Sequence, residues 1–173
     1  MPTRKQTPTA APPPVRSVQE AIKQTRPFRN RRTEAAVGLL LTAEAMRWPL
    51  QDLLARYDGL TLQQYNVLRI LRGAGAAGLP TLEIAERMIE RTPGVTRLLD
   101  RLDDKGLVER ERSRADRRQV FCRITAAGRK LLTRLDKPVD ELDDAVTRGL
   151  DDGEVAELIR LLDKLRHRLP EPT

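Results

Sequence analysis

Arginines are concentrated in one short segment of the chain, at a density suited to binding an anion. Within twelve residues the segment contains Arg112, Arg114, Arg117, Arg118 and Arg123. A planar guanidinium can bind a phosphate through two parallel hydrogen bonds. Asp116 lies two residues before Arg118, where its carboxylate can hold that guanidinium in place. The segment predicts contact with a polyanion, and the alternative is an exposed loop with unrelated charges.

A glycine-rich run offers a second candidate chemistry, the binding of a dinucleotide. Residues 73–78 read Gly-Ala-Gly-Ala-Ala-Gly and match the pattern GxGxxG. Binding of a dinucleotide by this pattern requires a strand before the glycines and a helix that begins within the glycine-rich run. Here a helix is expected before the run, and the next helix begins only after it. A loop between helices is therefore the favoured interpretation.

Side chains for metal binding or covalent catalysis are scarce. The chain has one cysteine, Cys122, and one histidine, His167. A single cysteine excludes a disulfide framework and a cysteine-rich zinc module. We interpret Cys122 as a small buried apolar residue rather than a redox switch, and His167 as a residue near a helix end. No nucleophile, base and orienting group form a set, so neither an enzyme nor a cofactor is expected.

The charge of the 173-residue chain is unevenly distributed. Residues 1–32 carry eight basic groups and one acidic group, and residues 87–134 carry fourteen basic and seven acidic groups. Residues 135–173 have the opposite balance, with six basic and eleven acidic groups. Two basic zones predict a polyanionic partner. The alternative is a solvated surface of mixed charge with a basic tail.

Residues 1–32 are predicted to form a disordered basic arm. Five of the twelve prolines lie in the first 14 residues, which hold almost no large apolar side chains. Such a segment cannot offset the entropy lost on ordering. The arm either adds affinity for a polyanion or has no binding role, and we expect the latter. With no apolar stretch of 18 residues and no secretory signal, a cytoplasmic protein without a membrane span is expected.

Hydrophobic spacing and capping residues predict three helices in the first half of the chain. Residues 34–57 are rich in Leu and Ala, and Pro49 is expected to kink or divide this helix. Thr61 and Gln64 have the spacing of a capping box for a helix over residues 62–72. Thr81 is expected to cap a third, short helix.

The next helix carries one apolar face and one polar face. Thr92 is expected to cap it, with Pro93 in the first helical position. Its apolar stripe has the spacing i, i+3, i+4, i+7 and consists of Val95, Leu98, Leu99 and Leu102. Its opposite face consists of Thr96, Arg97, Asp100, Arg101 and Asp104.

After Gly106 the hydrophobic period changes to two, which predicts strands over residues 107–112 and 120–124. Thr125 then caps a long helix, in which Pro138 implies a bend, and Asp151 begins another helix. The apolar positions of the first of these follow a near-heptad seam of Leu135, Val139, Leu142, Val146 and Leu150. This apolar surface is larger than a small lobe can bury, so part of the seam is expected to contact a partner chain.

The predicted order of elements is that of a helix-turn-helix followed by a β-hairpin. The second helix of such a pair can enter the major groove of DNA. An arginine-rich hairpin tip suits the phosphate backbone and the narrow minor groove.

Three stretches of sequence resemble the MarR family of bacterial winged-helix regulators. They are Gly59 to Leu68, Thr96 to Arg110, and the segment Asp116-Arg117-Arg118 with the following residues 124–129. The resemblance is close over residues 60–132 and extends loosely to residues 34–168. It implies a homodimer, held by the first and last helices, that binds a pseudo-palindromic operator in double-stranded DNA.

The resemblance also implies roles for individual residues. Arg97 would contact backbone phosphate, and Gly94, Val95, Thr96 and Arg101 would lie at or near the major groove. Arg118 would enter the minor groove, held by Asp116, and Arg117 would contact phosphates. Thr92 and Arg114 complete the set of candidate DNA-binding residues. Gly94 departs from the Ser or Thr frequent in the family at this place.

Small aromatic or phenolic molecules bind many members of this family between the dimerisation helices and the winged lobe. The resemblance therefore implies an effector site, for which the candidate residues are Met46, Trp48, Tyr57 and Tyr65. The alternative is that these side chains belong to the core.

The sequence thus predicts a mainly α-helical winged helix-turn-helix protein with a small β-hairpin and long terminal dimerisation helices. The expected parts are the arm (1–32), an N-terminal dimerisation helix (33–60), a DNA-binding lobe (61–126) and C-terminal dimerisation helices (127–170). The predicted function is sequence-specific transcriptional regulation, with repression favoured, by a cytoplasmic protein located on the nucleoid. The alternative is an architectural protein that binds DNA without specificity.

Overall fold

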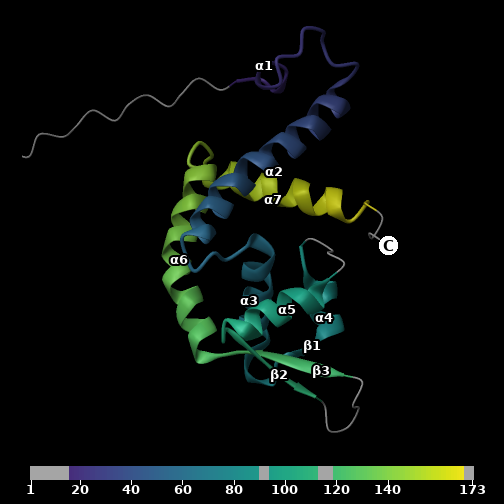
Figure 1. Cartoon of the computed structure of the whole chain (residues 1–173). Coiled ribbons are helices and arrows are strands. Elements are labelled where there is room, and N and C mark those ends of the chain that lie inside the picture. Colours follow the sequence, from purple (N-terminus) through teal and green to yellow (C-terminus); the bar gives the residue numbers. More distant parts are fainter. Residues whose placement is uncertain (1–15, 90–93, 113–118, 170–173) are drawn as a thin grey trace, which may run out of the picture. The chain divides into compact units, whose positions relative to one another are not determined.

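The computed structural model describes residues 16–89, 94–112 and 119–169 (Figure 1). The chain divides into two compact units, residues 1–45 and residues 46–173. Helix α2 (Arg31–Ala55) begins in the first unit and ends in the second. It continues through Pro49, so of the two outcomes expected for this proline, division of the helix is excluded.

The first unit contains a short helix that the sequence analysis missed. Helix α1 (Val18–Ala21) begins at a capping box, in which Ser17 and Glu20 exchange hydrogen bonds. The prediction of a disordered arm is therefore wrong for these residues, because a reciprocal cap satisfies the amide groups at the helix start. Residues 1–15 lie outside the described residues.

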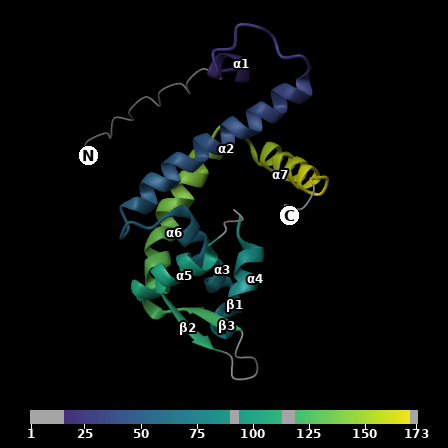
Figure 2. The same cartoon turned by 45° about the vertical axis from the view of Figure 1, so that its right-hand side comes forward.

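The second unit contains a lobe of helices packed against a small sheet (Figures 1 and 2). Its helices are α3 (Leu62–Ala74), the 3-10 turn η1 (Gly75–Ala77), α4 (Thr81–Arg87) and α5 (Val95–Asp104). Its strands are β1 (Leu79–Pro80), β2 (Val108–Arg112) and β3 (Val120–Ile124). Two C-terminal helices follow, α6 (Ala126–Thr147) and α7 (Asp152–Arg166). The predicted fold class, mainly α with a small β element, is confirmed.

The β element in the described residues is a three-stranded antiparallel sheet rather than a hairpin alone. The strand order is β1-β3-β2, and Leu79 of β1 pairs with Cys122 of β3. Strand β1 was not predicted, because two residues are too few to show an alternating pattern. The hairpin strands β2 and β3 lie where they were predicted, with Val108 paired to Ile124.

Local capping signals explain most of the helix starts. Thr61 and Gln64 form the predicted capping box of α3, and the Thr125 hydroxyl accepts a hydrogen bond from the Gly128 amide at the start of α6. The prediction for Thr81 is wrong, since it is the first residue of α4 and its hydroxyl donates to the Val120 carbonyl. Thr81 therefore joins α4 to the sheet instead of capping the helix.

The glycine-rich run forms the end of α3 and the turn η1, as expected for a loop between helices. Gly78 has a positive φ of 69°, and a Cβ atom there would lie 2.4 Å from the carbonyl oxygen of Cys122. Glycine is required at this position because the chain passes so close to β3.

The predicted seam of α6 divides into two parts. Leu135 and Val139 belong to the buried core, with 0% and 7% of their surface exposed. Further along, Val146 and Leu150 are 47% and 40% exposed. The first part of α6 therefore completes the lobe, while its last turn and the turn that follows it leave apolar surface uncovered in a single chain.

Close packing at the start of α6 makes a stability prediction. A Cβ atom on Gly128 would lie 2.3 Å from the Leu107 carbonyl oxygen, so Gly128→Ala should lower the free energy of unfolding by about 1–3 kcal/mol. At Gly73 of α3 nothing lies within 4 Å, and Gly73→Ala should raise it by about 0.5–1 kcal/mol. Thermal and urea unfolding of both variants measure the difference. Equal effects of the same sign would refute this account of Gly128.

Candidate nucleic-acid interface

Helix α5 presents a polar face to solvent because its other face is buried. Leu99 and Leu102 are fully buried, and Val95 and Leu98 are 7% exposed. Thr96, Arg97 and Arg101 are exposed on the opposite side, as is Gly94 at the helix start. Of the predicted recognition-helix residues, four are therefore accessible to a partner. Val95 is buried and acts as a core residue, which corrects its predicted place at the major groove.

The start of α5 differs in part from its prediction. The N-cap position is occupied by Gly94, whose φ is 126°, and the helix begins at Val95. Thr92 and Pro93, which were expected to form the cap and the first helical residue, lie outside the described residues. Because glycine has no side chain, the N-cap residue cannot accept a hydrogen bond from the first backbone amides of α5.

The C-terminal end of α5 is fixed by a glycine turn and by a lysine. Gly106 has a φ of 66°, and the amides of Gly106 and Leu107 donate to the carbonyls of Asp103 and Leu102. This is the hydrogen-bond pattern of a Schellman motif. The Lys105 ammonium donates to the Asp58 carbonyl at 2.7 Å, which ties the end of α5 to the turn that follows α2.

An ion pair connects α5 to the wing. The guanidinium of Arg110 on β2 donates to the carboxylate of Asp100 on α5. The Arg110 side chain is only 24% exposed, and its buried Nε has no hydrogen-bond partner in the described part of the chain. Asp100 is the ion-pair partner of Arg110 in the described residues, and the pair joins the base of the wing to α5.

Cys122 lies directly across the sheet from Arg110. It is fully buried, and burial raises the pKa of its thiol above the ordinary value. Since a thiol reacts through its thiolate form, both burial and the raised pKa disfavour oxidation. The interpretation of Cys122 as a buried apolar residue agrees with this environment.

The hairpin arginines do not share one role. Arg123 donates to Glu111 across the two strands at 2.7 Å and to the Ala76 carbonyl at 3.1 Å, so it joins β3 to β2 and to η1. Arg112 is exposed at the end of β2. The predicted wing residues Arg114, Asp116, Arg117 and Arg118 lie outside the described residues. The structure therefore removes Arg123 from the segment proposed to contact an anion.

The four candidate effector residues have different environments. Tyr65 is 5% exposed and belongs to the core, where burial raises the pKa of its hydroxyl. Trp48 is 71% exposed and Met46 43% exposed. Tyr57 is partly buried, with the Arg134 guanidinium 5.3 Å from its ring centre. Tyr65 is therefore a structural residue, which residue type alone could not have revealed.

A helix pair that leads into an exposed polar helix, followed by a hairpin, defines a winged helix-turn-helix. The described residues hold no group of three or more side chains suited to a metal ion. None of the helices in the described segments is long and apolar enough to cross a membrane.

Comparison with known proteins places this fold in a family. The MarR family model matches residues 60–120. The structure of a MarR transcription factor from Planctomyces limnophilus is 39% identical and covers 79% of this chain and 98% of its own, with a TM-score of 0.60. The structure of NadR in complex with 4-hydroxyphenylacetate is 30% identical and covers 81% and 97%, with a TM-score of 0.64.

A DNA complex is also among the similar structures. Staphylococcus aureus MepR bound to DNA is 25% identical, covers 78% of this chain and 97% of its own, and has a TM-score of 0.71. This chain belongs to the MarR family. It is therefore a transcriptional regulator rather than an enzyme.

The Asp100–Arg110 pair generates a prediction about stability. Asp100→Ala leaves the largely buried Arg110 guanidinium without its ion-pair partner and should lower the free energy of unfolding by about 1–3 kcal/mol. Asp104→Ala, on the exposed face of the same helix, is the matched control and should change it by less than about 0.5 kcal/mol. Urea unfolding measures both. Indistinguishable midpoints would show that the pair contributes nothing.

Proposed function

We propose that this chain represses transcription by binding a pseudo-palindromic DNA operator as a homodimer. The observation that carries the proposal is the geometry of α5, whose exposed Thr96, Arg97 and Arg101 lie opposite a buried apolar stripe. A rigid helix with this polar face fits the major groove, which is about 12 Å wide. The structure of MepR in complex with DNA supports DNA as the partner. We further propose that the protein is cytoplasmic and located on the nucleoid.

We assign distinct roles to the polar side chains of the interface. Arg97 contacts backbone phosphate, and Thr96 and Arg101 lie at the base edges, with the backbone of Gly94 close to them. Thr92 at the helix entry completes this group. In the wing, Arg118 enters the minor groove beside Asp116, while Arg114 and Arg117 contact phosphates. Phosphate contacts set affinity and position, and contacts with base edges set specificity.

The homodimer is supported by apolar surface that a single chain leaves uncovered. Helix α7 buries none of its residues, although it is amphipathic. Its exposed apolar side chains are Leu158, Ile159, Leu161 and Leu165, between 39% and 54% exposed, and Leu169 follows the helix at 67%. In α2, Leu39 and Leu40 are 42% and 70% exposed. Such surface on long terminal helices is typical of an interface with a second copy.

We propose that a small aromatic or phenolic molecule releases the operator. NadR was crystallised with 4-hydroxyphenylacetate, a phenolic acid. In this chain Met46, Trp48 and Tyr57 supply partly or fully exposed side chains for such a ligand. An effector changes the population of the DNA-binding conformation of the dimer only if it binds one dimer conformation more tightly than the other.

The operator proposal is tested by selection and competition. Genomic fragments retained by the purified protein are sequenced, and the enriched site is then competed with random duplex. We expect a preference of at least about 10³-fold for the selected site. Arg118→Ala should weaken operator binding and leave the dimer intact, because it removes a proposed groove contact only. Equal affinity for every duplex would instead indicate an architectural protein, and unchanged affinity of the variant would refute the wing assignment.

The homodimer is tested at the uncovered end of α6. Val146→Asp places a charge on a half-exposed apolar position and should convert dimer to monomer, as measured by sedimentation. The lobe core lies elsewhere, so the far-ultraviolet circular dichroism should persist. Ala145→Asp, on the neighbouring exposed position, is the control and should remain dimeric. A dimeric Val146→Asp variant would exclude this part of α6 from the interface.

A further inference from the structure

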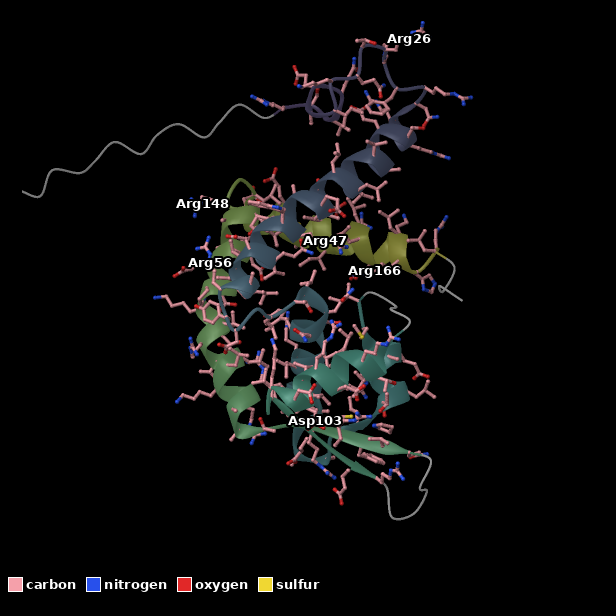
Figure 3. All side chains as sticks on the ribbon, in the orientation of Figure 1. Arg26, Arg47, Arg56, Asp103, Arg148 and Arg166 are labelled. Atoms are coloured by element: carbon pink, nitrogen blue, oxygen red, sulfur yellow. The ribbon has the colours of Figure 1, made fainter. Side chains whose placement is uncertain are left out.

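Six basic side chains are concentrated in the described residues of the first unit, and we call them the basic segment. They are Arg16, Lys23, Arg26, Arg29, Arg31 and Arg32. All six residues are exposed, and none of them is paired with a carboxylate in the described part of the chain. Figure 3 shows Arg26 extending away from the ribbon. The basic segment therefore offers uncompensated positive charge to a partner.

The basic segment is held in a defined conformation. The Ser17–Glu20 capping box fixes the start of α1, and the hydrogen bond from Ser17 lowers the pKa of Glu20. The Gln24 side chain donates to the Arg26 carbonyl at 2.6 Å, and the Asn30 side chain accepts from the Thr33 amide at 3.0 Å. A Cβ atom on Gly38 would lie 3.1 Å from a methyl group of Val18, so α1 packs closely against α2. These contacts fix the backbone that carries the basic side chains, which lowers the entropic cost of binding a partner.

An opposite charge excess lies on the C-terminal helices, and we call it the acidic segment. It consists of Asp140, Asp143 and Asp144 near the end of α6 and Asp152 at the start of α7. The four side chains are exposed and have no ion-pair partner among residues 16–89, 94–112 and 119–169. The three residues of α6 are three and four positions apart, so they share one side of the helix.

Both segments adjoin the uncovered apolar surface. Arg32 and Leu39 are seven residues apart on the same face of α2, and Leu39 is 42% exposed. On α6, Asp143 precedes the half-exposed Val146 by three residues, which places the two side chains next to each other. An apolar centre with a charged rim is the ordinary composition of a protein–protein interface.

We propose that the basic segment of one subunit binds the acidic segment of its partner subunit. This inference rests on the proposed homodimer and adds an electrostatic contact to it. A second copy of this chain supplies both charges, so each dimer neutralises two basic and two acidic segments. DNA would neutralise the basic segment and leave the acidic one without a partner. Residues 16–32 thus form a docking element for the partner subunit.

Paired charge reversals test the contact in the full-length protein. Arg29→Glu with Arg32→Glu, and separately Asp140→Lys with Asp144→Lys, should each weaken the dimer about 10-fold or more at low salt. The two sets combined should restore the affinity to within about 3-fold of the original, because opposite charges again face each other. High salt should reduce all these differences. Sedimentation over a range of concentrations and salt measures the dissociation constants.

The charge reversals are not expected to destabilise the helices that carry them. They place acidic side chains at the start of α2 and basic side chains near the end of α6, which favours both helices through their dipoles. Loss of dimer therefore cannot be ascribed to loss of these helices, and circular dichroism checks this. Lys130→Glu with Arg112→Glu changes the net charge by the same amount as the basic-segment reversal, at exposed positions of the lobe outside both segments, and this control should keep the original dissociation constant.

The outcomes separate this inference from the proposed function. If the unmodified protein is a monomer at every salt concentration, the homodimer itself is refuted. If it is a dimer but neither reversal weakens it, or the combined variant is no tighter than the single sets, the contact between segments is refuted. If the basic-segment reversal weakens only DNA binding and lowers its salt dependence, the segment binds phosphates and the inference is likewise overturned.

Discussion

The interface of the lobe depends on the burial of one side of α5. Leu99 and Leu102 are fully buried in the core, and Val95 and Leu98 are nearly so. Burying this stripe fixes the rotation of the helix about its axis, because a shift of one residue would turn it by about 100°. Such a turn would bring a charged residue toward the apolar core at a cost of several kcal/mol. The exposed direction of Arg97 and Arg101 thus follows from the packing of leucines.

The two ends of the chain differ from the lobe in their exposed apolar side chains and in their unbalanced charge. The lobe buries most of its large apolar side chains, with Leu68, Leu71 and Leu135 fully buried, and leaves Leu82 and Ile89 exposed. The terminal helices do not bury theirs to this extent, and the side chains of the basic and acidic segments have no ion-pair partner in the described part of the chain. Reading DNA through two lobes requires that they be held at a fixed separation. In the proposed dimer, the exposed apolar surfaces and the opposite charges of the terminal helices would hold the two lobes at that separation.

Much of the fold could be predicted from the sequence because its signals are local. Capping residues such as Thr61 and Thr125, and the stripe of α5, act within a few residues and identified those helices. Strand β1 could not be predicted, since it exists only by pairing with β3. The partnership of Asp100 with Arg110 and the burial of Tyr65 also depend on residues brought together by folding. The sequence therefore predicts the candidate interface in outline, while the contacts that position it form between residues distant in the sequence and are seen only in the folded structure.

The hydrogen bond from Lys105 to the Asp58 carbonyl has a mechanical consequence. Asp58 follows α2 with a left-handed φ of 56°, and Lys105 ends α5, so one bond of 2.7 Å links the two helices. Because the lysine side chain is flexible and exposed, a displacement of the turn after α2 carries the end of α5 with it only while this bond persists. Because the leucines of α5 resist rotation, the easier response is a tilt of the helix about its buried side. In the proposed complex, a small strain near Tyr57 would then change the angle at which α5 approaches the groove of DNA.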